Sequence, residues 1–324
     1  MSQDRGEEMM RMDQGVVMAL DRQARPRRFR WGRLAPAAFV APFLFLLLAF
    51  NLYTFASGAR MSLTDATGID PGGWVGLANY KWLFTNTLLP TFLRAMKQTV
   101  LFTLGCLLTQ IPAAFVLAVI LNGVLGRFRG ILRASFYVPV LINTALTALL
   151  FQMLFNQDSG ALNWVLGLFG LEKVNWLYDG RYTLWVMIAA AFWQWTGYHM
   201  VYILAALQVV DPALYEVAKL DGASPLRTMF QITLPYIRPA LTFITIMATI
   251  GGLQQFEYSF LIFPNAGYGP GRLGMTAVPF VYYKGFNHLE FGVSAAAGWI
   301  LFLVILAVSI LQLKFLKLGE VGDI

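Results

Sequence analysis

Residues 34–57 read LAPAAFVAPFLFLLLAFNLYTFAS and contain no Asp, Glu, Lys or Arg. A helix needs roughly 20 consecutive apolar residues to cross the hydrocarbon core of a bilayer, and this stretch exceeds that length. It is also longer than the apolar core of about 7–15 residues in a secretory signal peptide, and a long polar leader precedes it. The stretch therefore predicts a membrane-spanning helix that is not cleaved.

Five further stretches are long and apolar enough to span a bilayer. They are residues 99–121, 134–155, 183–207, 240–263 and 291–313. Over the whole chain 58% of residues are hydrophobic and only 13% are charged, which leaves too few polar side chains to cover a soluble globule. We predict an all-α integral membrane protein with six transmembrane helices, organised as a leader (1–33), a transmembrane domain (34–313) and a tail (314–324).

The distribution of basic residues predicts the orientation of these spans. Sixteen of the 24 Lys and Arg residues lie in the leader, the tail and the connections 122–133 and 208–239. Cytoplasmic segments carry the excess of Lys and Arg, so we expect both termini in the cytoplasm. The arginines that crowd before the first span suit an anionic leaflet better than nucleic acid. The single cysteine, Cys106, excludes an intrachain disulfide, and no metal-ligand spacing is present.

The connection 208–239 reads QVVDPALYEVAKLDGASPLRTMFQITLPYIRP and is too polar to span. Asp211-Pro212 and Ser224-Pro225 each supply a capping side chain followed by a first-turn proline, so each predicts the start of a short helix. Asp221-Gly222 predicts a tight turn between the two helices. We expect the second helix to end near Gln231, and Pro235 and Pro239 to break the chain before the fifth span.

This loop resembles the EAA motif of permease subunits of bacterial ATP-binding-cassette importers. That pattern is E-A-A, three residues, G, nine residues, then I-x-L-P. The chain has Glu216-Val217-Ala218, Gly222 and Ile232-Thr233-Leu234-Pro235 at this spacing, and only Val217 departs from it. The resemblance implies that the EAA loop (208–239) fits a cleft in an ATPase subunit, through Glu216, Ala218, Asp221, Gly222, Ala223, Ile232, Leu234 and Pro235.

Two other elements resemble the carbohydrate-uptake branch of these permeases, which includes maltose- and glycerol-3-phosphate-type systems. Residues 76–80 read GLANY, and Phe256-Glu257 is similar to a Phe-Asp pair of the fifth span. Residues 264–270 read PNAGYGP and depart from the T-x-G-G-P stretch of this branch.

The resemblance implies a subunit of an importer in a bacterial or archaeal inner membrane. Its partners would be a second permease of different sequence, two copies of a cytoplasmic ATPase and an extracytoplasmic solute-binding protein. The chain has no G-x-x-x-x-G-K-[ST] phosphate loop, so we expect no ATPase site, no catalytic residue and no cofactor of its own. Two alternative functions are a stand-alone secondary transporter and a membrane-embedded enzyme. A secondary transporter would show inverted repeats and several charges within its spans. A membrane-embedded enzyme would show clustered acids, a metal site or a nucleophile at the membrane face.

Polar residues within the spans are the candidates for a substrate pathway. Glu257 is the only Asp, Glu, Lys or Arg in the six predicted spans, and such groups tend to face a cavity or a partner. Gln254, Gln255 and Tyr258 form a polar stripe beside it at helical spacing, while other candidates lie on the fourth span (Trp193, Gln194) and the third (Asn143). Hydrogen bonds between helices are the alternative use of these side chains.

Aromatic rings beside amides and a carboxylate suit a sugar, which offers apolar C–H faces and many hydroxyls. A phosphate would need basic groups in the pathway, and the predicted spans contain none. The sequence therefore favours a neutral saccharide, with glycerol-3-phosphate or another small polar solute as the alternative.

Overall fold

The computed structural model describes residues 31–87, 91–123, 127–264 and 268–315. The chain divides into two units, Met1–Ser57 and Gly58–Ile324, which are described separately. Almost all of the predicted leader and tail lies outside the described residues, so these two segments stay predictions.

The first unit consists, in its described part, of most of helix α2 (Trp31–Ser62). This helix confirms the first predicted span. Its segment Phe39–Ser62 has a mean hydropathy of 2.0 and is apolar on all sides, as expected for a helix surrounded by hydrocarbon.

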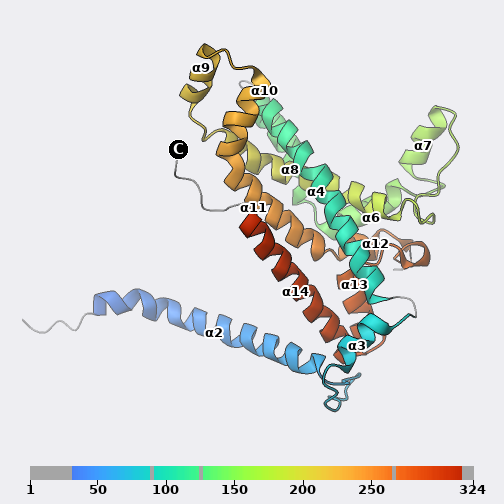
Figure 1. Cartoon of the computed structure of the whole chain (residues 1–324). Helices are drawn as coiled ribbons and strands as arrows, with labels where there is room; N and C mark the ends of the chain where they lie inside the picture. The colour runs from blue at the N-terminus through green and yellow to red at the C-terminus, as the bar shows by residue number, and fades with distance from the viewer. Residues whose placement is uncertain (1–30, 88–90, 124–126, 265–267, 316–324) are drawn as a thin grey trace, which may run out of the picture. The chain divides into compact units, whose positions relative to one another are not determined.

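Four long helices form the frame of the second unit: α4 (Phe92–Gly123), α8 (Thr183–Leu207), α11 (Leu234–Leu253) and α14 (Phe291–Phe315). Helix α8 packs most extensively against α4, and α11 contacts α4, α8 and α14. Figure 1 shows the short helices α9 and α10 at one end of α4, and α3 and α13 at the other. Buried side chains such as Phe102, Met187, Met200 and Ile203 fill the space between α4 and α8.

The described residues contain four helices that are long and apolar enough to cross a membrane, and six if each of two bent helix pairs counts as one span. The all-α membrane fold is therefore confirmed, and six is the upper end of the number of spans. The second, fourth and sixth predicted spans correspond to α4, α8 and α14.

The prediction of one continuous third span (134–155) is wrong. Two helices occupy this region, α5 (Arg127–Leu141) and α6 (Thr144–Leu154), and they are bent by 95°. The Asn143 side chain accepts a hydrogen bond from the Ala145 N–H at 2.8 Å and so caps α6. The backbone carbonyl of Ile142 at the bend accepts a hydrogen bond from Gln194 on α8 at 2.7 Å. An irregular backbone at this depth is stable only when its polar groups are satisfied in this way.

The fifth span also differs from the predicted single helix over residues 240–263. Helix α10 (Pro225–Thr228), the π-helical turn η1 (Met229–Thr233) and α11 follow one another without a break, so Pro235 and Pro239 do not break the chain as predicted. The wider π-turn directly before Pro235 accommodates a residue that has no N–H to donate. The break occurs later, at Gln254–Phe256, and α12 (Glu257–Leu261) follows it.

The GLANY element begins helix α3 (Ala78–Thr85) and fastens the segment that follows α2. Asn79 is buried, and its side-chain amide donates hydrogen bonds to the backbone oxygens of Ser62 and Thr64 at 2.9 and 2.8 Å. The Tyr80 hydroxyl lies 2.8 Å from the Ser62 hydroxyl. These contacts give the GLANY residues a structural role at the end of the bundle opposite α9.

Between the fifth and sixth spans the chain folds into a short 3-10 turn, η3 (Pro270–Arg272), then α13 (Ala277–Tyr282) and a π-helical turn, η4 (Tyr283–Asn287). Lys284 of η4 is buried, forms an ion pair with Glu290 at 2.9 Å and lies over the Trp82 ring at 4.4 Å. Burial also raises the pKa of Tyr268 to about 12, so that this hydroxyl stays protonated. The connection is therefore a packed part of the fold.

Candidate functional site

The EAA loop is built from two capped helices, as the sequence predicts. Asp211 caps α9 (Pro212–Leu220) by accepting the Ala213 N–H at 2.9 Å, and Ser224 caps α10 by accepting the Arg227 N–H at 3.3 Å. Each helix has a proline at its first position, where a missing N–H costs nothing. Caps of this kind contribute about 1 kcal/mol each to helix stability.

The turn between the two helices is a Schellman motif centred on Gly222. The N–H of Ala223 donates to the carbonyl of Ala218 at 2.9 Å, and the N–H of Gly222 donates to the carbonyl of Lys219 at 3.1 Å. Gly222 has a φ of +72°, a conformation that glycine adopts without steric cost. The conformation of the turn therefore explains why a glycine stands here.

The outer face of the EAA loop combines apolar and charged side chains. Leu220 is 87% exposed, and Val217, Leu226 and Phe230 are also exposed. The exposed charged residues of the two helices and their turn are both acidic (Glu216, Asp221) and basic (Lys219, Arg227). Such a surface, apolar with a few charges, is typical of a docking site for another protein.

The inner face of the EAA loop is attached to the bundle. Ala218 is buried, and the Tyr215 hydroxyl of α9 lies 3.3 Å from the Thr233 hydroxyl of η1. Leu214 and Tyr215 pack against the core cluster between α4, α8 and α11. Of the other predicted coupling residues, Ala223, Ile232 and Leu234 are half-buried and Pro235 is exposed. The EAA loop is thus held against the spans and does not hang free from them.

A cavity of about 520 Å³ lies between α4, α8, α11 and α12. Four predicted pathway residues line it, and the break after α11 brings them together: Gln254, Gln255, Glu257 and Tyr258. The lining also includes aromatic side chains and contains neither Lys nor Arg. The helical stripe that the sequence predicts does not form as such, because α11 ends at Leu253.

Gln194 does not line the cavity but supports its wall. Its side-chain oxygen accepts a hydrogen bond from the Tyr258 hydroxyl, and its amide nitrogen donates to the Ile142 carbonyl. It therefore connects the bend of the third span to α12. Gln194 therefore forms hydrogen bonds between helices, which is the alternative use that the sequence leaves open for these side chains.

Two predicted pathway residues lie away from the cavity. Asn143 is the cap of α6, and the Trp193 ring packs against Phe151 with its centroid 5.9 Å away. Asn143-Thr144 is a sequence typical of a helix start, and this signal could have identified the cap.

A pair of polar side chains from α4 and α8, which the sequence does not predict as a pair, also lies at the cavity. Gln110 on α4 and His199 on α8 both line the cavity, and their side chains lie 3.3 Å apart. A carboxamide oxygen can only accept, so His199 Nε2 carries the proton in this pair and Nδ1 is left as an acceptor. Among the described residues His199 Nδ1 and Gln255 Nε2 have no hydrogen-bond partner. Both atoms are shielded from solvent in this conformation of the chain.

Three hydrogen bonds join α4 and the residues around α12 to the connection that leads into α13. Ser259 donates to the Gly274 carbonyl at 2.5 Å, Thr276 donates to the Gln255 carbonyl at 2.9 Å, and the Ala277 N–H donates to the Thr99 hydroxyl at 2.7 Å. The residues are buried, so these bonds are protected from water. They fasten the connection before α13 to α4 and to the broken fifth span.

An all-α chain with several spans, a cavity between them and a capped helical loop at one end has the architecture of a transport subunit. The chain belongs to the family of binding-protein-dependent transport system inner membrane components, which matches residues 110–317. It is therefore a multi-pass inner-membrane permease of an ATP-binding-cassette importer that works with an ATPase and a periplasmic binding protein. It is a transport component without ATPase activity or cofactor, and the partner subunit hydrolyses ATP.

Individual relatives come from carbohydrate-uptake systems. The arabinooligosaccharides transport system permease protein AraP of Bacillus subtilis (strain 168) is 35% identical over 285 residues, which cover 87% of this chain and 88% of AraP. The lactose transport system permease protein LacF of Rhizobium radiobacter is 31% identical, with 85% of this chain and 91% of LacF covered. A chain in the crystal structure of a bacterial importer of the acidic polysaccharide alginate has the same fold, with a TM-score of 0.78, 24% identity, and 90% of this chain and 99% of that chain covered.

Proposed function

We propose that this permease forms half of the translocation pathway for a neutral saccharide, delivered by the extracytoplasmic binding protein. The composition of the cavity carries this proposal. Its lining offers aromatic rings, the amides of Gln110, Gln254 and Gln255, and the carboxylate of Glu257, without a cation. A sugar needs both apolar surface and hydrogen-bonding groups, whereas glycerol-3-phosphate would need a cation beside its phosphate. The relatives named for arabinooligosaccharides and lactose support the same substrate class.

The EAA loop is the docking site for the ATPase in this proposal. Its exposed face of apolar and charged side chains lies on the cytoplasmic side, together with both termini. The second half of the pathway is a permease of different sequence, and two ATPase subunits bind the pair of permeases from the cytoplasm. The helix from Pro225 to Leu253 is uninterrupted, and at 1.5 Å per residue it is roughly 40 Å long. A displacement of the loop would therefore be transmitted to the break after Leu253, where Gln254 and Gln255 line the cavity.

Uptake by the reconstituted importer tests the substrate site. Gln255→Leu and Tyr258→Ala remove a hydrogen-bonding group and an aromatic ring from the cavity wall, so we expect the half-saturating concentration of a labelled oligosaccharide to rise. Trp193→Phe is the matched control, because Trp193 lies outside the lining. An unchanged half-saturating concentration in both cavity variants would show that this cavity is not part of the translocation pathway. Saturable import of glycerol-3-phosphate in place of sugars would favour the alternative substrate.

A further inference from the structure

Helix α7 (Ala161–Leu168), between the third and fourth spans, has the reverse of the usual arrangement of polar and apolar side chains. Its polar residue, Asn163, is 3% exposed, whereas Trp164 is 67% and Leu168 is 65% exposed. The apolar surface continues into Phe169 and Leu171, which are exposed beyond the helix end. Helix α7 contains no charged residue. We define Trp164, Leu168, Phe169 and Leu171 as the α7 face.

Hydrogen bonds fix the orientation of this helix. The Asn163 amide nitrogen donates to the backbone oxygens of Gln157 and Val174 at 3.0 and 2.9 Å. Its side-chain oxygen accepts from the Val174 N–H and from the Trp176 indole N–H, both at 3.0 Å. All hydrogen-bonding positions of this amide are used, so α7 cannot rotate to bury its apolar side without breaking four bonds.

The end of α7 is fixed as well. Gly170 has a φ of +70°, and the N–H groups of Gly170 and Leu171 donate to the carbonyls of Gly167 and Leu166 at 3.1 and 3.0 Å. This is the same Schellman motif that ends α9. Trp176 packs edge-on against Phe155, which is part of the core of the bundle. The α7 face is thus a fixed feature of the folded chain.

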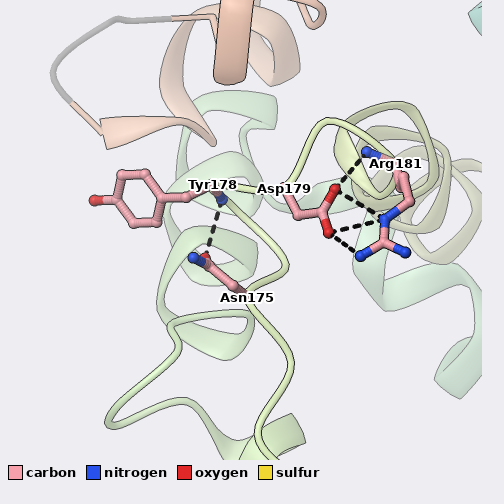
Figure 2. Close-up of polar contacts among 4 residues, drawn as sticks. All are labelled: Asn175, Tyr178, Asp179 and Arg181. Atoms are coloured by element: carbon pink, nitrogen blue, oxygen red, sulfur yellow. Dashed lines mark hydrogen bonds and ion pairs between the residues drawn. The ribbon is translucent and has the colours of Figure 1, made fainter.

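Polar groups of the same connection gather in the turn before α8. Figure 2 shows Asn175 accepting the Tyr178 N–H, and Arg181 forming hydrogen bonds and an ion pair of 2.6 Å with Asp179. The Arg181 guanidinium holds the pKa of the Asp179 carboxyl below its usual value, so the pair stays charged at neutral pH. The connection therefore has an uncharged apolar helix and a charged turn, the division that a membrane–water interface selects.

We propose that the α7 face inserts into the outer leaflet of the membrane and anchors the connection between the third and fourth spans at the lipid surface. The inference rests on the proposed function, because the orientation proposed there places this connection outside. A binding protein that docks and leaves would expose this uncharged surface to water during every cycle, whereas lipid covers it at all times. Helix α6, which contacts α7, also has an exposed apolar row, formed by Leu146, Leu150 and Met153.

Spin labelling of the complete importer in lipid nanodiscs tests this inference. A nitroxide is attached to Leu168→Cys, with Lys173→Cys as the matched control on the exposed polar part of the same connection. The unsubstituted chain, whose single cysteine is buried, is the blank. We expect the label at 168 to collide several-fold more with oxygen than with a water-soluble nickel chelate, and the label at 173 to show the reverse. Trp164→Cys repeats the measurement from a second position.

Three results would overturn the inference. Equal access of the nickel chelate to labels at 168 and 173 would place the α7 face in water. Immobilisation and protection from both reagents would place it against a protein partner, either the second permease or the binding protein. If an impermeant maleimide reaches Lys173→Cys only from the cytoplasmic side, the proposed orientation of the chain is wrong. This result distinguishes a wrong orientation from a correct orientation without a membrane anchor.

Discussion

Replacing Gly222 by valine is expected to abolish transport while the chain remains in the membrane. Gly222 has a φ of +72°, and a Cβ built on it meets nothing within 4 Å, so the substitution causes backbone strain without a collision. A non-glycine residue in this conformation costs about 1–2 kcal/mol, and more when it is branched at Cβ. Loss of the two hydrogen bonds of the Schellman turn would add about 0.5–1.5 kcal/mol each.

The total cost, about 2–5 kcal/mol, falls on the turn, and each 1.4 kcal/mol is a tenfold change in the population of the native turn. The spans are stabilised by lipid and by contacts distant from Gly222, so insertion should be unaffected. The assay compares the amount of chain in the membrane with substrate uptake and with ATPase activity stimulated by the binding protein. Gly222→Asn should retain part of the activity, since asparagine tolerates positive φ.

Gly130→Val is the matched control, because Gly130 lies in helix α5 and a Cβ there also meets nothing within 4 Å. We expect this variant to transport nearly as well as the natural chain. Normal uptake by Gly222→Val would refute the argument, since the loop would then work without its turn. Absence of that variant from the membrane would also contradict it, because the strain would not be local.

Three further substitutions test other contacts. Asp211→Ala removes the cap of α9 and should destabilise this helix by about 1 kcal/mol, so we expect uptake and coupled ATPase activity to fall only partly. Full activity of this variant would show that α9 needs no cap. Gln194→Leu leaves the Ile142 carbonyl and the Tyr258 hydroxyl without their partner, at about 1–3 kcal/mol each, so thermal unfolding in detergent should begin several degrees lower. Thr99→Val removes the acceptor of the buried Ala277 N–H, at about 1–3 kcal/mol, so thermal unfolding in detergent should begin several degrees lower; an unchanged unfolding temperature would contradict that role.

The sequence predicts the elements whose signals are local. Asp211, Ser224 and Gly222 lie where capping and turn rules place them, because each rule involves only a few neighbouring residues. Apolar length identifies the spans formed by α2, α4 and α14, whereas α8 passes the same test only together with α9. The spacing of the EAA motif also predicts the family of importer permeases, and the family match over residues 110–317 confirms it.

The breaks within spans could not be predicted, because they depend on partners distant in the sequence. The bend at Ile142 is stable because Gln194 satisfies its carbonyl, and the break at Gln255 is stable because Thr276 donates to its carbonyl. Hydropathy treats both regions as continuous apolar stretches. For the same reason the sequence places Asn143 in the pathway although it caps α6, and it gives no signal that Gln110 pairs with His199, which lies 89 residues away in the sequence.

Photocrosslinking from the EAA loop tests the central claim most directly. A benzophenone amino acid replaces Leu220, whose side chain is 87% exposed at the tip of α9, and cells that express the whole importer are irradiated. The account predicts a covalent product with the cytoplasmic ATPase subunit, whose yield changes when ATP is depleted. A product with the extracytoplasmic binding protein, or no ATPase product at any nucleotide level, would contradict it.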